Sequence, residues 1–183
     1  MRNKFILVLL VFLSATNCFS EEEASTKTIK TALFTIQVPK TGWVVKKNLP
    51  EPYLIALVSE IESGKDTFME NLVIYRDKLA DQQSLEDIIT VVSETAKSKR
   101  PDFIIVNDTR IKAGKEDVRR QVCTMTFPEF VSKNIQYFME KDGYVYVMVA
   151  SIPEDVFEQW QAIFDTMVKS FRVDKADNSA NNL

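Results

Sequence analysis

Residues 135–150 read IQYFMEKDGYVYVMVA, and this stretch decides the fold. Asp142 and Gly143 form a two-residue turn signal, because both residue types tolerate the positive φ angles that tight hairpins require. The apolar runs on either side predict two antiparallel strands, 135–140 and 144–150. The centre of the domain is therefore expected to be an antiparallel sheet.

The register of this hairpin sorts its side chains onto two faces. A two-residue turn places Tyr137 opposite Met148 and Met139 opposite Tyr146 on one face, with phenylalanine and valine on the other. Because both faces are apolar, we expect the chain to cover both, which gives a sheet between helices. The alternative is an open surface that awaits a partner. Its residues would be Tyr137, Met139, Tyr144, Tyr146 and Met148.

Further strands are expected on both sides of a central helical segment. Alternation in 34–38, ending at Pro39, predicts a first strand, and Trp43 with Val45 follows a turn at Gly42. Two more pairs of strands are predicted, each joined by a glycine-containing turn. Their ranges are 53–61 with 71–75, and 103–111 with 118–127.

Two helices are predicted. In 85–96 the apolar residues recur at helical spacing after Ser84, the expected N-cap, with Asp87 at the third helical position, and Pro101 stops the helix. Ser151 and Glu154 have the spacing of a capping box and predict the start of the last helix. Its apolar stripe is typical of a helix packed on a sheet: Phe157, Trp160, Phe164, Met167, Val168 and Phe171. The expected class is α+β.

The first twenty residues have the pattern of an export signal. A positive start is followed by an apolar run that is about half the ~20 residues needed to span a bilayer. Two processing routes are open: lipid attachment at Cys18, in an imperfect lipobox, or cleavage after Ser20. We expect an export signal in 1–20, a linker in 21–27, one domain in 28–173 and a disordered tail in 174–183. This organisation predicts a periplasmic or envelope protein, touching the membrane only through a possible lipid anchor.

Composition limits the possible partners and chemistry. Residues 21–183 hold 21 basic and 26 acidic residues, a formal net charge of −5, so nucleic acid is a poor partner. The chain has no histidine, which excludes triads that use this base. Its four glycines are isolated, and no phosphate-binding loop or cofactor site is predicted.

A few residues could still carry chemistry. Cys123 lies in a predicted strand on the same face as Arg119, and we interpret it as a buried, inert thiol. Carboxylate pairs such as Asp102 with Asp108, or Asp165 with Glu158, leave a glycosidase-like hydrolase as a distant alternative. A nearer alternative is a protein that binds a small ligand or a hard cation, with oxygen ligands from Asp102, Asp108 and Glu116. No metal residues are assigned.

The order of these features resembles the PsbP-like superfamily. The resemblance rests on the export signal, a strand that ends in Pro39 with Gly42 and Trp43 close behind, and two further groups of residues. These groups are Phe68, Asn71, Leu72 and Ile74, and Phe164, Met167, Ser170 and Phe171. Within the superfamily, the bacterial DcrB-type envelope proteins are the most similar. The resemblance implies an antiparallel sheet between helices and an accessory, assembly or scaffold role on a larger complex, without catalytic residues.

Overall fold

The computed structural model describes residues 26–60, 68–127 and 130–174 of the 183-residue chain. The predicted export segment 1–20, with Cys18 and Ser20, lies outside these residues, as does most of the predicted tail. In the part that is described, no helix has the length and apolar character needed to cross a membrane.

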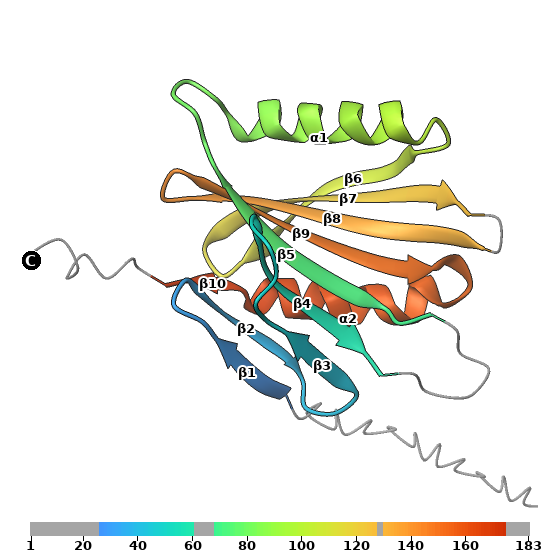
Figure 1. Ribbon diagram of the computed structural model, residues 1–183, viewed down its shortest axis with the longest axis horizontal. Helices are drawn as coiled ribbons and strands as arrows, with labels where there is room; N and C mark the ends of the chain where they lie inside the picture. Colours follow the sequence, from blue (N-terminus) through green and yellow to red (C-terminus); the bar gives the residue numbers. More distant parts are fainter. Residues whose placement is uncertain (1–25, 61–67, 128–129, 175–183) are drawn as a thin grey trace, which may run out of the picture.

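Ten strands, two α-helices and a short 3-10 helix make up the described part of the chain (Figure 1). The first five strands are β1 (Thr26–Lys30), β2 (Phe34–Pro39), β3 (Trp43–Lys46), β4 (Tyr53–Ser59) and β5 (Asn71–Lys78). The others are β6 (Ile104–Ala113), β7 (Glu116–Thr126), β8 (Val131–Lys141), β9 (Tyr144–Pro153) and β10 (Arg172–Val173). The helices are α1 (Leu85–Lys99), η1 (Glu154–Val156) and α2 (Phe157–Ser170).

All strand pairs in the two sheets are antiparallel. Seven strands form one sheet in the order β3-β4-β5-β9-β8-β7-β6, and a smaller sheet has the order β1-β2-β10. The predicted α+β architecture, an antiparallel sheet between helices, is confirmed. The β8–β9 hairpin has the predicted register, with Tyr137 opposite Met148 and Met139 opposite Tyr146.

One face of the large sheet packs against α2 and the smaller sheet. Inward residues of β2 and the apolar stripe of α2 join the large core on this face. The Trp43 ring lies edge-on to both Trp160 and Phe164, with centroids 5.8 Å and 5.7 Å away. This side is the main hydrophobic core of the protein.

Helix α1 lies on the opposite face (Figure 1), where it packs over β8 and β9 and reaches Arg110 of β6 and Arg119 of β7. Its own buried residue Ile89 packs with Phe138, Val145 and Val147, which alternate along β8 and β9 with residues of the main core. The predicted N-cap is confirmed, because Ser84 Oγ accepts a hydrogen bond from the Asp87 N–H at 3.2 Å. This second cluster is much smaller than the main core.

The predicted start of the last helix at Ser151 is wrong. Ser151 belongs to β9 and pairs with Asn134 of β8 and Asn71 of β5. These two strands provide the backbone partners that a helix cap would otherwise supply, so β9 continues to Pro153 and α2 begins only at Phe157.

The predicted linker 21–27 also ends too late, because β1 starts at Thr26. Its sequence, TKTIK, contains one apolar residue, and β10 is only two residues long. Neither segment shows enough periodicity to be recognised as a strand by itself. Both are formed through pairing with β2.

Candidate functional site

The side of the large sheet that carries α1 is only partly covered by the described residues. Strands β3 and β4 lie beyond α1, and β5 lies at its edge, because Tyr75 packs against the cluster beneath α1. The outward side chains of these strands alternate with residues of the main core. Val44 is 44 % exposed and Tyr53 is 45 % exposed. We name this surface the open face. It consists of Val44, Tyr53, Ala56, Val58, Val73, Tyr75 and Val149.

The open face is apolar because β3, β4 and β5 carry apolar residues on both sides. In β3, Trp43 points into the main core, so its neighbour Val44 must point to the other side. Val44 lies opposite Val58, and Val73 lies opposite both Ala56 and Val149. Strands of this kind are normally covered on both sides, and here the second cover is missing among the described residues.

Two tyrosines form one end of the open face. Tyr53 and Tyr75 lie opposite each other on β4 and β5, and their rings meet edge-on with centroids 5.9 Å apart. Burial, together with the nearby Tyr53 and Asp77, raises the pKa of Tyr75 to about 12. Tyr75 therefore offers a neutral phenol to anything that binds there.

Ion pairs and hydrogen bonds hold α1 on the sheet at both ends. Near its start, Glu86 pairs with Arg110 of β6 at 3.1 Å and approaches Arg119 of β7 at 3.6 Å. At its end, Arg100 pairs with Asp102 at 3.2 Å, and Asp102 accepts the Thr126 N–H at 2.6 Å. Arg100 and this N–H hold the pKa of Asp102 below its ordinary value.

The layer between α1 and the sheet contains buried polar groups without partners. Gln121 Oε1, Gln136 Oε1 and Ser93 Oγ are buried, and none of them has a hydrogen-bond partner among the described residues. Gln121 lies opposite Gln136 on β7 and β8, and its Nε2 donates to Asp108 at 2.9 Å. Each unpartnered group costs on the order of 1–3 kcal/mol, so α1 is held less well than its end contacts suggest.

Cys123 also lies on the side of β7 that faces α1, opposite Asn134. It is fully buried, and burial, with a smaller effect of Asp108, raises the pKa of its thiol to about 12. The expected burial of this thiol is confirmed. Arg119 does not activate it, because that guanidinium is bonded to Asp108.

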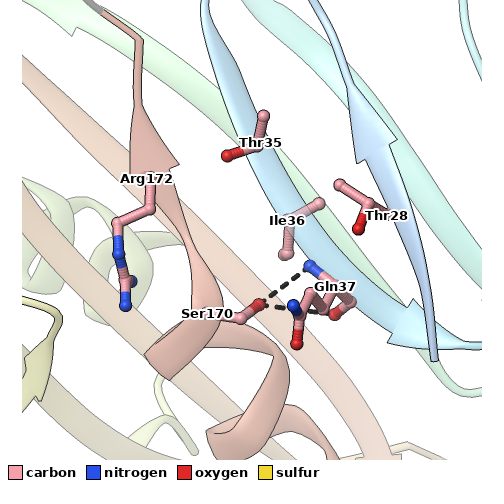
Figure 2. Close-up of a pocket in the computed structure, with 6 residues that line it drawn as sticks. All are labelled: Thr28, Thr35, Ile36, Gln37, Ser170 and Arg172. Atoms are coloured by element: carbon pink, nitrogen blue, oxygen red, sulfur yellow. Dashed lines mark hydrogen bonds between the residues drawn. The ribbon is translucent and has the colours of Figure 1, made fainter. Parts of the chain in front are cut away.

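A separate pocket of about 290 Å³ lies between the smaller sheet and the end of α2 (Figure 2). Ser170 Oγ accepts the Gln37 N–H at 2.8 Å, which joins α2 to β2 at the pocket. Arg172 Nη1 donates to the carbonyl groups of Lys169 and Phe171, both at 2.7 Å. The lining is mainly polar: Thr28, Thr35, Ile36, Gln37, Ser170 and Arg172.

The five tyrosine and methionine residues predicted to form an open partner surface do not form one. Tyr137, Met139, Tyr146 and Met148 are at most 2 % exposed and belong to the main core. Tyr144 is partly buried, with the Arg76 guanidinium 4.5 Å above its ring. Helix α2 packs on this face, as the preferred interpretation of the sequence predicted, and the open-surface alternative is wrong.

A polar network joins this face of the sheet to α2. Asp165 accepts hydrogen bonds from the Tyr137 hydroxyl at 2.7 Å and from Arg120 Nε at 2.8 Å. Gln161 accepts a further hydrogen bond from Arg120 and donates to Glu158. Asp165 and Glu158, one of the carboxylate pairs considered for hydrolysis, are therefore both engaged in structural contacts.

The carboxylates considered as ligands for a hard cation are not brought together. Asp102 pairs with Arg100, Asp108 with Arg119, and Glu116 with Lys141 at 2.9 Å. Within residues 26–60, 68–127 and 130–174, no group of three or more acidic or cysteine side chains could hold a metal ion. These ion pairs also engage both carboxylates of the Asp102–Asp108 pair, which was considered for hydrolysis.

No protein-family model and no curated protein matches this sequence. Solved structures with a similar fold do match. Cyanobacterial PsbP (CyanoP) from Synechocystis has a TM-score of 0.62 at 15 % identity, covering 87 % of this chain and 99 % of that chain. The expected PsbP-like fold is confirmed.

Two further structures share this fold. LpqN of Mycobacterium tuberculosis, described as involved in cell envelope biogenesis, has a TM-score of 0.57 at 11 % identity, covering 81 % of this chain and 90 % of that chain. The Saccharomyces cerevisiae Ran-binding protein Mog1p has a TM-score of 0.58 at 11 % identity, covering 82 % and 96 %. At these identities the likeness concerns the fold alone.

Sequence reasoning missed the open face. Val44, Tyr53 and Val73 lie in segments that were predicted as strands, but their apolar pattern is the same as that of covered strands. One signal was available: the sequence pattern of the described residues predicts two long helices for a sheet with two apolar faces. A count of helices against strands would have indicated that part of one face stays open.

Proposed function

We propose that this chain is a non-catalytic, exported envelope protein of the DcrB type, an accessory, assembly or scaffold factor that binds a larger protein complex. The observation that carries this proposal is the open face, an apolar surface on one half of a sheet whose other half is covered by α1. Exposed apolar patches of this kind mark interaction sites in soluble domains. The PsbP-like fold and the signal pattern of residues 1–20 support the envelope assignment.

The experiment is cross-linking of the tagged full-length chain in intact envelopes, followed by purification and mass spectrometry. We expect one membrane complex to be recovered with the wild-type chain and at least tenfold less with Val73→Glu, which puts a charge on the open face. The matched control is Thr26→Glu, on the exposed side of β1 and outside the polar pocket. Recovery of the chain alone, or equal recovery with Val73→Glu, contradicts the proposal.

Export and lipid attachment are tested separately, by mass spectrometry of the amino-terminal peptide of the mature protein. A diacylglycerol-modified Cys18 supports a lipid anchor, whereas a free amino terminus at Glu21 supports cleavage after Ser20. The Cys18→Ser variant is the control for the first outcome. A protein that keeps residues 1–20 and stays in the cytoplasm contradicts export.

A second candidate function is small-ligand binding, favoured by the polar pocket beside Arg172. Its lining offers hydroxyl, amide and guanidinium groups and no carboxylate, so it suits a small anion better than a cation. Thermal melting with phosphate, acetate or citrate tests it, because a ligand at a hundred times its Kd adds about 2.7 kcal/mol. A shift that Arg172→Met removes supports this function, and no shift with any of them counts against it.

A further inference from the structure

The open face continues from the sheet onto the side of α1. Ile88 and Val92 are one helical turn apart, and both pack against the same buried cluster as Tyr75 and Val149 of the sheet. Glu86 lies on the opposite flank of the helix, fixed by Arg110 and Arg119. Val91 extends the apolar side of α1 outward and is 55 % exposed. The sheet forms a floor and α1 forms a wall.

The uncovered width of this floor matches one helix. Neighbouring strands lie about 4.8 Å apart, so the strip from β3 to β5, where the α1 cluster begins, is roughly 10 Å wide. An α-helix with its side chains is about 10–12 Å across. A helix placed beside α1 would cover this half of the sheet as α1 covers the other half, completing a layer of helices on the sheet.

The rim of the open face carries charges of both signs: the Asp77 carboxylate lies near Tyr75 at the tyrosine end, and two lysines lie elsewhere on the rim. Lys46 points to the same side of β3 as Val44, at the outer edge of the floor. Lys99 falls seven residues after Val92, on the same flank of α1, in its last turn. Both side chains are exposed, and neither belongs to an ion pair in the described part of the chain.

From this floor, wall and rim we infer that the open face binds an amphipathic helix of a partner protein, lying beside α1 with acidic residues at the positions that face Lys46 and Lys99. Its apolar stripe packs on Val73, Tyr75 and Val92, and its carboxylates face Lys46 and Lys99. This inference rests on the proposed function and adds the kind of segment that is bound. An extended strand would instead need a free strand edge, and the open face is the flat side of the sheet.

The test places a photo-cross-linking residue, p-benzoylphenylalanine, at Val44 or at Tyr53 of the full-length chain in intact envelopes. The cross-linked partner peptides are then sequenced by mass spectrometry. We expect attachment points three or four residues apart along one apolar stripe with acidic neighbours, which is helical spacing. Thr26, exposed on β1, is the control position, where no such peptide is expected.

A charge variant makes the inference specific. Lys46→Glu should lower the cross-linking yield at Tyr53 about twofold to fivefold, the range of a single exposed ion pair. Lys30→Glu, at an exposed position of β1, should leave it unchanged. Circular dichroism checks that both variants are folded.

Four outcomes distinguish a failure of the inferred helix partner from a failure of the proposed function. Helical spacing together with a loss of yield in Lys46→Glu supports the inference. Attachment at every second residue of the partner, or an unchanged yield in Lys46→Glu, overturns the inference and leaves the proposed function standing. Cross-linking of these positions to lipid instead of protein contradicts both the inferred helix and the existence of a protein partner at the open face. Absence of any cross-link at Val44 and Tyr53 overturns the docking surface and the proposed function together.

Discussion

The two faces of the seven-stranded sheet are built from the same strands and differ in how they are covered. The α2 face is packed by a helix and a second sheet, and its buried Arg120 is paired with Asp165. The α1 face carries one helix over a four-residue cluster, with unpartnered oxygens on Gln121, Gln136 and Ser93. One face supplies most of the stability, and the other is available for binding.

This difference has a physical cause. Regions with few buried apolar contacts and incompletely bonded polar groups open at lower free energy than a packed core. A partner that docks on the α1 side therefore disturbs little of what keeps the domain folded. The predictions below compare the two faces, from the largest expected effect to the smallest.

Truncation of one core residue on each face should have unequal effects. Phe164→Ala on the α2 face removes a fully buried ring that contacts Trp43 and Trp160, and should lower the free energy of unfolding by about 3–5 kcal/mol. Ile89→Ala on the α1 face should lower it by about 2 kcal/mol, because its cluster is small and can relax. Urea unfolding measures both. An equal or larger loss of unfolding free energy in Ile89→Ala would contradict the difference between the two faces.

The buried ion pair of the α2 face should matter more than an exposed one. Asp165→Asn leaves the Arg120 guanidinium, whose side chain is 9 % exposed, without its carboxylate and should cost about 3 kcal/mol of unfolding free energy. Asp117→Asn breaks the exposed pair with Lys112 and should change it little. Unfolding of the two variants at the same urea concentration would contradict a stabilising role of the network around Arg120.

Tyr75 gives the open face a signature at alkaline pH. Because its pKa is raised from 10.0 to about 12 in the folded protein, its contribution to stability is complete below pH 10 and is lost between pH 10 and 12. The two-unit shift corresponds to at most about 2–3 kcal/mol. Tyr75→Phe should therefore reduce the fall in unfolding free energy from pH 9 to 11. Identical falls in both proteins would contradict the burial of this hydroxyl.

The unpartnered glutamine beneath α1 should be replaceable with a gain. Gln136→Met keeps the approximate volume, removes a buried oxygen without a hydrogen bond, and should raise the free energy of unfolding by about 1 kcal/mol. Gln121→Met removes the hydrogen bond to Asp108 and should lower it by about 1 kcal/mol. Loss of stability in Gln136→Met would show that this side chain has a partner after all.

The parts of the fold that were predictable from the sequence are those determined by residues that lie close together in the sequence. The β8–β9 hairpin follows from Asp142 and Gly143, whose φ angles are 52° and 76°, and the α1 cap follows from Ser84 and Asp87. Ser151 shows the limit. Its local pattern favours a helix cap, and pairing with distant Asn71 and Asn134 makes it part of a strand.

The candidate site was less predictable than the fold. Val73 and Val147 lie in strands with the same apolar pattern, yet α1 buries Val147 and leaves Val73 partly exposed. The position of α1 across the sheet decides this, and it follows from the packing of Ile89 on Phe138, Val145 and Val147, which are distant in sequence. Periodicity shows that a strand has two apolar sides, and only tertiary packing shows which side stays open.

The most direct test of the central claim measures stability and binding in a single variant, Val44→Glu. On an exposed edge of the sheet this change should alter the free energy of unfolding by less than about 1 kcal/mol. The same change should reduce envelope cross-linking at least tenfold, while Thr26→Glu, at an exposed position of β1, alters neither quantity. Undiminished cross-linking in Val44→Glu, or a loss of several kcal/mol, would contradict the assignment of the open face as the binding surface.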